Sequence, residues 1–153
     1  MEPNKLSSLM MSAEQIFAAN NGGRLTATRR QVLSSILKSE KALSAYELAD
    51  RVRTDFDRVI PPMSVYRILD VLIEAKLVHK VSLVNKYIVC SHFNCKHKHT
   101  MARFLVCKDC HRVNESMEQT AAVRKLEKNI EDSGFHLMNK QIEISCLCHK
   151  CAE

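Results

Sequence analysis

The chain has 153 residues and carries 23 lysines and arginines against 17 aspartates and glutamates, a net charge of +6. This length allows one ordinary domain or two very small ones, and the modest positive charge suits a polyanion partner without requiring one. No stretch approaches the roughly 18 apolar residues of a membrane span, and the start lacks the pattern of a secretory signal. We therefore expect a cytoplasmic protein with no membrane partner. In the reducing cytoplasm, the seven cysteines are better explained as metal ligands than as disulfides.

Two amphipathic helices are predicted at the beginning of the chain. Apolar side chains recur at helical spacing over residues 6–20, and the Asn-Asn-Gly-Gly that follows ends this helix. A second helix begins near Thr26 or Thr28, either of which can cap it, and runs to about Ser39. Its valine, leucine and isoleucine side chains form a stripe that we expect to be buried.

Two further helices follow, each with a recognisable start. Ser44 and Glu47 form a capping box, in which the serine oxygen accepts a backbone amide while the glutamate reaches back, and this box opens a third helix. Pro61 and Pro62 block continuation of the preceding segment and prepare a new N-terminus. A fourth helix with a regular apolar face begins there, with Ser64 as its cap or its first residue.

The segment LVHKVSLVNKYIVC after the fourth helix is predicted to form two strands. A turn at Val84-Asn85 places His79 opposite Cys90, with their Cβ atoms about 5 Å apart. Helices followed by a hairpin are typical of a winged helix-turn-helix domain, whose fourth helix would enter the DNA major groove with its first turn leading. A generic helical bundle with a hairpin is the alternative.

The second half of the chain begins with a polar, histidine-rich hinge at residues 91–103. Short strands flank the C-x-x-C that follows, a helix is predicted over about 116–133 with Gly134 as its stop, and KQIEISCLC forms a last strand. Neither half can bury a generous core alone, so a metal staple and a partner subunit are both expected. The helix side chains expected to face inward are Ala122, Val123, Leu126 and Ile130.

Two C-x-x-C pairs, separated by 37 residues, predict a metal site. Four thiolates prefer a tetrahedral soft metal ion, usually zinc, and they leave no open coordination position, so the site should be structural. Reduced buried thiols or a reversible disulfide switch are the alternatives. Cys146 is interpreted as a core residue and Cys95 as a surface thiol in the hinge. The predicted ligands are Cys107, Cys110, Cys148 and Cys151.

A second group of residues combines imidazole, thiolate and carboxylate. His79, Cys90, Glu115 and a hinge histidine can complete a four-coordinate zinc site, and the sulfur favours zinc over ferrous iron. Such a site would fix one domain against the other, because its ligands come from the wing, the hinge and the second domain. Each histidine taken singly is more often a solvated polar side chain, and only the combination of residues supports the hypothesis of a metal site. The hinge candidates are His92, His97 and His99.

An ordered series of motifs resembles the ferric uptake regulator superfamily, and most closely its zinc uptake regulator branch. The motifs are LTATRRQVL, SAYELADRVR, PPMSVYRILDVLIEAKLVHKV, NKYIVC, FLVCKDCHRVNE and CLCHKC, within residues 6–151. The resemblance implies an α+β protein with a winged helix-turn-helix DNA-binding domain at 1–90, the hinge at 91–103 and a small α/β dimerisation domain with a four-cysteine zinc site at 104–153. It implies a homodimeric, zinc-responsive repressor of zinc-acquisition genes, with no enzymatic activity and no small-molecule substrate.

The resemblance also implies two zinc ions per chain. The four cysteines of the two C-x-x-C pairs match the structural ligands, and His79, Cys90, His99 and Glu115 match the regulatory ones. His99 is preferred to His97 because it precedes a threonine, although the segment that follows is one residue longer than usual. His111 stands where the family commonly has glycine. An iron, nickel or peroxide sensor of the same superfamily and a thiol redox switch are the alternative functions.

The expected DNA partner is a palindromic double-stranded operator, read by two recognition helices in successive major grooves about 34 Å apart. Regulatory zinc would hold the winged helices at that spacing. Partial packing into the core is the alternative role for Tyr46 and Tyr66. The residues predicted to contact bases or the adjacent backbone are Tyr46, Ser64, Tyr66 and Arg67, and the predicted phosphate clamps are Arg24, Arg29 and Arg30.

Overall fold

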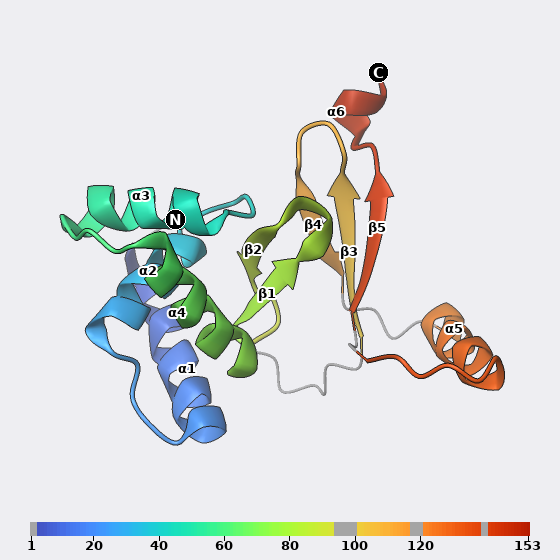
Figure 1. Cartoon of the computed structure of the whole chain (residues 1–153), viewed down its shortest axis with the longest axis horizontal. Helices are drawn as coiled ribbons and strands as arrows, with labels where there is room; N and C mark the ends of the chain where they lie inside the picture. Colours follow the sequence, from blue (N-terminus) through green and yellow to red (C-terminus); the bar gives the residue numbers. More distant parts are fainter. Residues whose placement is uncertain (1–2, 94–100, 117–120, 139–140) are drawn as a thin grey trace. The chain divides into compact units, whose positions relative to one another are not determined.

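The chain divides into two compact units, Met1–Cys95 and Lys96–Glu153. The computed structural model describes residues 3–93, 101–116, 121–138 and 141–153 (Figure 1). Three hinge residues named above, Cys95, His97 and His99, lie outside the described residues. Within these ranges, no helix is long and apolar enough to cross a membrane.

The first unit consists of four helices and a two-stranded wing (Figure 1). The side chain of Thr26 caps the second helix by accepting a hydrogen bond from the Arg29 backbone N–H, which settles the choice between two threonines. The predicted capping box of Ser44 and Glu47 is confirmed in both directions. The helices are α1 (Pro3–Asn21), α2 (Ala27–Leu37), α3 (Ala45–Phe56) and α4 (Pro62–Glu74).

A closed apolar core holds this unit together. Its fully buried side chains come from the predicted stripes of α2, α3 and α4 and from the wing, and each contributes about 1.5–3 kcal/mol by its removal from water. The core includes Val32, Leu33, Leu48, Val52, Val65, Leu69, Leu72 and Tyr87, none of which is more than 2% exposed.

The start of α4 differs from the prediction for Ser64. Pro61 is the N-cap and Pro62 the first helical residue, while Ser64 donates its backbone N–H to the Pro61 carbonyl (2.9 Å) and lies inside the first turn. The prediction that Ser64 caps or begins the helix was therefore wrong. Proline has no backbone N–H that would need a hydrogen-bond partner, and its fixed φ suits a helix. The helix therefore begins at Pro62, two residues before Ser64.

The other end of α4 is a Schellman motif. The Lys76 backbone N–H donates to the Ile73 carbonyl (2.9 Å), and the Leu77 N–H donates to the Leu72 carbonyl (3.0 Å). Lys76 has φ +60°, the left-handed conformation that glycine usually occupies at this position. This turn leads directly from α4 into the wing.

The wing pairs β1 (Val78–Val81) with β2 (Lys86–Val89) in antiparallel fashion. His79 lies opposite Ile88, and the Cys90 N–H donates to the Leu77 carbonyl (2.9 Å), so the predicted pairing of His79 with Cys90 was wrong. The reason is the turn: a 3-10 segment, Ser82–Val84, precedes Asn85 at φ +49°, where a two-residue turn was expected. The register shift of two residues keeps His79 and Cys90 on the same face, as diagonal neighbours.

The second unit contains a three-stranded sheet with the order β4-β3-β5 (Figure 1). Its central strand β3 (Ala102–Cys107) is antiparallel to β4 (Val113–Ser116) and parallel to β5 (Gln141–Cys146). The parallel pair requires a crossover, and the crossover contains the helix α5 (Ala121–Asp132). A short helix, α6 (His149–Ala152), follows β5. The predicted α+β class is confirmed, with an N-terminal winged helix-turn-helix unit and a C-terminal sheet unit.

The apolar stripe of α5 is not buried within the chain. The helix ends as predicted, with Gly134 at φ +80°, but none of its residues is buried and Leu126 is 42% exposed. The prediction that this stripe faces inward was wrong for the single chain. The three-stranded sheet is small, and the described part of the second unit buries no residue of this helix.

Candidate metal centres and nucleic-acid interface

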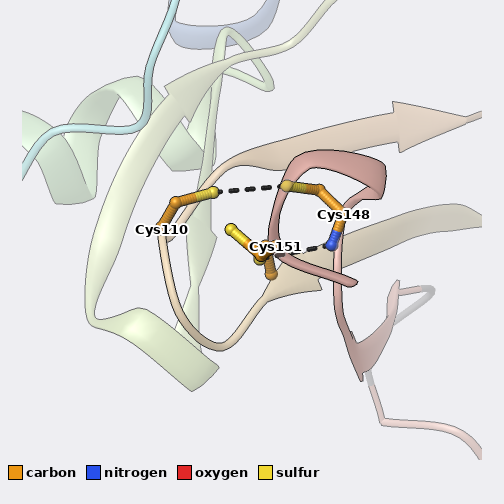
Figure 2. A group of neighbouring side chains, drawn as sticks. Cys110, Cys148 and Cys151 are labelled. Atoms are coloured by element: carbon orange, nitrogen blue, oxygen red, sulfur yellow. Dashed lines mark hydrogen bonds between the residues drawn. The ribbon is translucent and has the colours of Figure 1, made fainter. Parts of the chain in front are cut away.

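Four cysteine sulfur atoms converge in the second unit. The Sγ atoms of Cys107, Cys110, Cys148 and Cys151 all lie within 4.8 Å of one another. Figure 2 shows three of these side chains pointing toward each other from the β3–β4 turn and from the segment after β5, and the Cys110 and Cys148 sulfurs are 3.6 Å apart. The sequence spacing predicted this grouping.

The backbone around the first pair shapes the site. Cys107 ends β3 and is 2% exposed, and its carbonyl accepts a hydrogen bond from the His111 N–H (3.0 Å). His111 has φ +57°, a left-handed conformation that favours glycine. This conformation explains physically why glycine suits the position where this chain has histidine.

The second pair reaches the same point because β5 runs parallel to β3. Cys107 is the register partner of Cys146, so Cys148 and Cys151 follow just beyond the same edge of the sheet. Cys148 is the N-cap of α6, and its backbone N–H donates to the Cys107 sulfur (3.3 Å). The sheet register therefore fixes the approach of two thiol pairs that lie far apart in the sequence.

Three of the clustered thiols have pKa values shifted by their neighbours in the cluster. Backbone N–H groups of Cys110 and Cys148 donate to the Cys107 sulfur and lower its thiol pKa to about 6. Hydrogen bonds from the Cys151 and Cys110 thiols lower the pKa of Cys148. The same contacts, chiefly that with Cys148, raise the pKa of Cys151 to about 12. Without a cation, the raised pKa of Cys151 keeps this thiol protonated at neutral pH.

This donor set fits a soft divalent cation. Four convergent sulfurs match the tetrahedral four-thiolate geometry of structural zinc, which deprotonates its thiol ligands. A protein N–H that already points at one sulfur is the kind of outer-shell contact that orients a metal ligand. Because the protein supplies all four ligands, such an ion would hold structure and would have no open position for catalysis.

Cys146 has a different environment from the four clustered cysteines. It is half-buried, and its Sγ donates to the Val106 carbonyl (3.5 Å) within the sheet. It is not among the sulfur atoms that converge. Cys146 therefore serves as a matched control for the cluster.

The wing brings together two predicted ligands of the regulatory site. Cys90 is 3% exposed and His79 is half-buried, and a ring nitrogen of His79 lies within 4.8 Å of the Cys90 sulfur. The third candidate, Glu115, belongs to the second unit, where it is half-buried on β4 opposite Phe104. His92 is half-buried just beyond the wing.

Two of the predicted DNA contacts are exposed at helix starts in the first unit. Tyr46 is the second residue of α3 and is 63% exposed, so its ring is accessible to a partner. Arg67 lies in the second turn of α4 and is also exposed. Arg24 is exposed in the turn before α2.

Three other predicted contacts are engaged within the protein. Tyr66 is half-buried and packs edge-on against Tyr87, with ring centroids 6.4 Å apart. The Arg29 guanidinium lies 5.8 Å from the centre of the Phe17 ring. Arg30 forms a 2.7 Å ion pair with Glu14, which ties α2 to α1.

One exposed side chain at the start of α4, Met63, was not predicted from the sequence pattern. Met63 is the second residue of α4 and is 66% exposed. It precedes Arg67 by four positions, a spacing that places both side chains on one helix face and could have revealed it.

The winged helix-turn-helix unit, followed by a small sheet with a four-cysteine cluster, defines a two-domain protein of the metalloregulator class. The sequence matches the Ferric uptake regulator family over residues 20–145, and the chain belongs to this family. The family resemblance seen in the motifs is thereby confirmed.

Individual relatives agree with this assignment. The chain is 37% identical over 154 residues to the zinc uptake regulation protein of Escherichia coli (strain K12), covering 100% of this chain and 86% of the relative. A solved zinc uptake regulator complexed with zinc and DNA has a TM-score of 0.80 and 31% identity, covering 96% of this chain and 95% of the other. The crystal structure of holo XcZur has a TM-score of 0.76 and 35% identity, covering 95% and 97%.

Proposed function

We propose that this chain is a zinc-responsive, DNA-binding transcriptional repressor of zinc-acquisition genes. The observation that carries the proposal is the similarity, over nearly the whole chain, to a zinc uptake regulator solved with zinc and DNA. The winged helix-turn-helix unit supplies a DNA-reading fold. Such a regulator acts in the cytoplasm, where both zinc and chromosomal DNA are available to it.

One zinc ion would be structural and would bind the four clustered cysteines. The converging sulfurs and the hydrogen bond from the Cys148 N–H to Cys107 support this role. When bound, the ion would join the β3–β4 turn to the segment after β5 and remove the charge repulsion among the thiolates. Four protein ligands leave no place for a substrate, so we infer no enzymatic role.

A second zinc ion would be regulatory, with His79, Cys90, His99 and Glu115 as its ligands. The neighbouring imidazole and thiol of His79 and Cys90 support the wing's share of this site. The family assignment and the residue types support the contributions of the hinge and of Glu115. Mixed nitrogen, sulfur and oxygen donors favour zinc over iron.

The second unit would pair with the same unit of another copy to form a homodimer. Leu105 and Ile144 are register partners on one face of the sheet and are 36% and 42% exposed. Leu126 on α5 is 42% exposed in a helix that buries no residue of its own. A partner subunit would remove these side chains from water.

Regulatory zinc would control how often a dimer is ready to bind DNA. Two recognition helices must reach successive major grooves about 34 Å apart on a palindromic operator. An ion that ties the wing, the hinge and the dimer unit raises the fraction of competent dimers, and the apparent affinity rises in proportion. Operator DNA must then tighten zinc binding by the same factor, because the linkage is reciprocal.

The DNA contacts would come from the exposed starts of α3 and α4. Arg67 can bridge guanine O6 and N7, and Tyr46 can contact a thymine methyl group or a phosphate. Ser64 and Tyr66 would contribute from the half-buried edge of α4. Arg24 is exposed and would contact a phosphate. Arg29 and Arg30 would contact phosphates while they also contact Phe17 and Glu14 within the protein.

A zinc titration of DNA binding tests the function directly. The probe is a duplex selected from random sequence by the zinc-loaded protein, and metal content per chain is measured at each step. We expect binding to appear as the second zinc equivalent is filled. Cys90→Ser should remove the response while the fold and the first zinc ion are retained, whereas Cys146→Ser should behave as wild type. Binding that is indifferent to zinc would overturn the proposal.

A further inference from the structure

The exposed face of α4 changes character along its length. Met63 and Arg67 occupy its first half, and Asp70 and Glu74 occupy its second half. All four side chains are exposed, and their spacings of four and three residues place them on the face opposite the buried stripe. A helix that approaches a polyanion with this face must do so with its first two turns, because the acidic half is repelled.

Met63 is therefore the apolar side chain at the N-terminal end of the exposed face of α4 that would contact DNA. It is 66% exposed, and the adjacent proline fixes the helix start beneath it. In helix-turn-helix domains the N-terminal residues of the recognition helix reach the base edges. In the major groove, the apolar feature available to such a side chain is the 5-methyl group of thymine.

We propose that Met63 contacts the 5-methyl group of a thymine beside the base read by Arg67, and so contributes to operator specificity. This inference rests on the proposed DNA-binding function. Four residues of helix rise about 6 Å, so the two side chains fall within about two base-pair steps of each other. Together they would read a short step: a guanine by paired hydrogen bonds and a neighbouring thymine by an apolar contact.

The test combines a side-chain truncation with removal of the methyl group from the DNA. The probe is the selected duplex, prepared with thymine or with deoxyuridine at each position in turn. We expect one symmetric thymine position at which deoxyuridine weakens wild-type binding by on the order of tenfold, since two methyl contacts of about fourfold each are lost per dimer. Met63→Ala should lose the same factor on the thymine duplex and show no further loss on the deoxyuridine duplex.

Two control variants and the behaviour of the wild type separate this inference from the proposed function and from misfolding. Met11→Ala removes a comparably exposed methionine from α1 (62% exposed) and should leave affinity unchanged. Met63→Leu retains an apolar tip and should retain the thymine preference. Zinc-dependent binding by wild type with no methyl-sensitive position, or with equal losses for Met63→Ala on both duplexes, would overturn the role of Met63 alone. Failure of wild type to bind any zinc-selected duplex would instead overturn the proposed function.

Discussion

The two units of this chain are stabilised in different ways. The first unit buries Leu33, Leu48 and Leu69 completely among its own helices. The second unit has a three-stranded sheet whose buried side chains, such as Phe104 and Val106, lie on the central strand, while its helix α5 buries nothing. The difference lies in how much apolar surface each segment can cover by itself.

This contrast separates the reading of DNA from the response to metal. Because the first unit has an apolar core of its own, we expect it to keep its fold whether or not metal is present. Under the proposed function, the sheet unit is completed by a metal staple and a second subunit, so we expect its integrity to depend on zinc and on protein concentration. Each unit can therefore be altered by substitutions that leave the other unchanged.

Loss of a cluster ligand should have the largest effect. Structural zinc stabilises small domains by about 10–16 kcal/mol, so Cys110→Ser should release this ion and unfold the sheet unit. Hydrogen exchange of the β3 and β5 amides should rise, while that of α2 and α4 stays slow. Cys146→Ser, outside the cluster, is the matched control and should retain both metal and protection.

A cavity in the core of the winged unit should destabilise the first unit and leave the second unit and its metal unchanged. Leu69 is 0% exposed, and Leu69→Ala should destabilise the first unit by about 2–5 kcal/mol without changing metal content. Denaturation followed by hydrogen exchange measures the loss. Val59→Ala, at a side chain that is 80% exposed, should change stability by less than about 0.5 kcal/mol. Loss of zinc from Leu69→Ala would show that the units are not independent.

A charge on the apolar stripe of α5 should weaken the dimer. Leu126→Glu should raise the dimer dissociation constant by about 100-fold, because a carboxylate would have to be buried in the interface. Sedimentation equilibrium of the zinc-loaded protein measures this constant. Lys125→Glu introduces the same side chain at the neighbouring exposed position and should have little effect. Equal dissociation of both variants would mean that the stripe is not the interface.

Glycine at the left-handed positions should stabilise each unit separately. Lys76 and His111 have φ +60° and +57°, a conformation that carries a penalty of about 1 kcal/mol for residues with a Cβ. Lys76→Gly should raise the stability of the first unit by about that amount. His111→Gly should appear instead as tighter retention of the structural zinc against a chelator, because its turn carries two ligands. No change in either would argue that these turns are already relaxed.

The smallest effect concerns pH and the capping box. Burial raises the pKa of Glu47, but hydrogen bonds with the Ser44 N–H and Lys86 outweigh it and hold the pKa below the ordinary 4.5. The interaction therefore stabilises the first unit at neutral pH, and this contribution is lost as pH falls below 4.5 through the folded pKa. Glu47→Gln should reduce stability at pH 7 by at most about 0.5 kcal/mol, since Glu47 is exposed, and the deficit should shrink as the pH falls below the folded pKa of Glu47. Glu40→Gln is the exposed control.

Local sequence signals predicted the first unit well. The capping box of Ser44 and Glu47 and the apolar stripes of the core are set by neighbouring residues, so they can be predicted from short windows of sequence. The helix stop at Gly134 in the second unit is a local signal of the same kind. The start of α4 was misplaced because Pro62 can itself begin the helix and leaves Ser64 within the first turn. The wing register was misplaced because a 3-10 segment replaces the two-residue turn.

The candidate sites likewise divide into features that local sequence predicts and features that depend on packing between distant segments. The four clustered cysteines were predicted from spacing, because C-x-x-C pairs chelate from local turns. The exposure of the α5 stripe could not be predicted, because helical spacing shows which side chains share a face but not whether the described chain covers that face. The internal partners of Arg29 and Arg30 depend on the packing of α1 against α2, which local pattern does not specify.

Stepwise removal of zinc from the zinc-loaded protein tests most directly whether the two units depend on metal differently. Metal content, operator binding and hydrogen exchange are followed together as a chelator is increased. We predict that the first ion lost per chain abolishes operator binding while both units stay folded, and that the second unfolds the sheet unit while the helices of the winged unit stay protected. A single step in which metal, DNA binding and protection of both units disappear together would contradict this prediction.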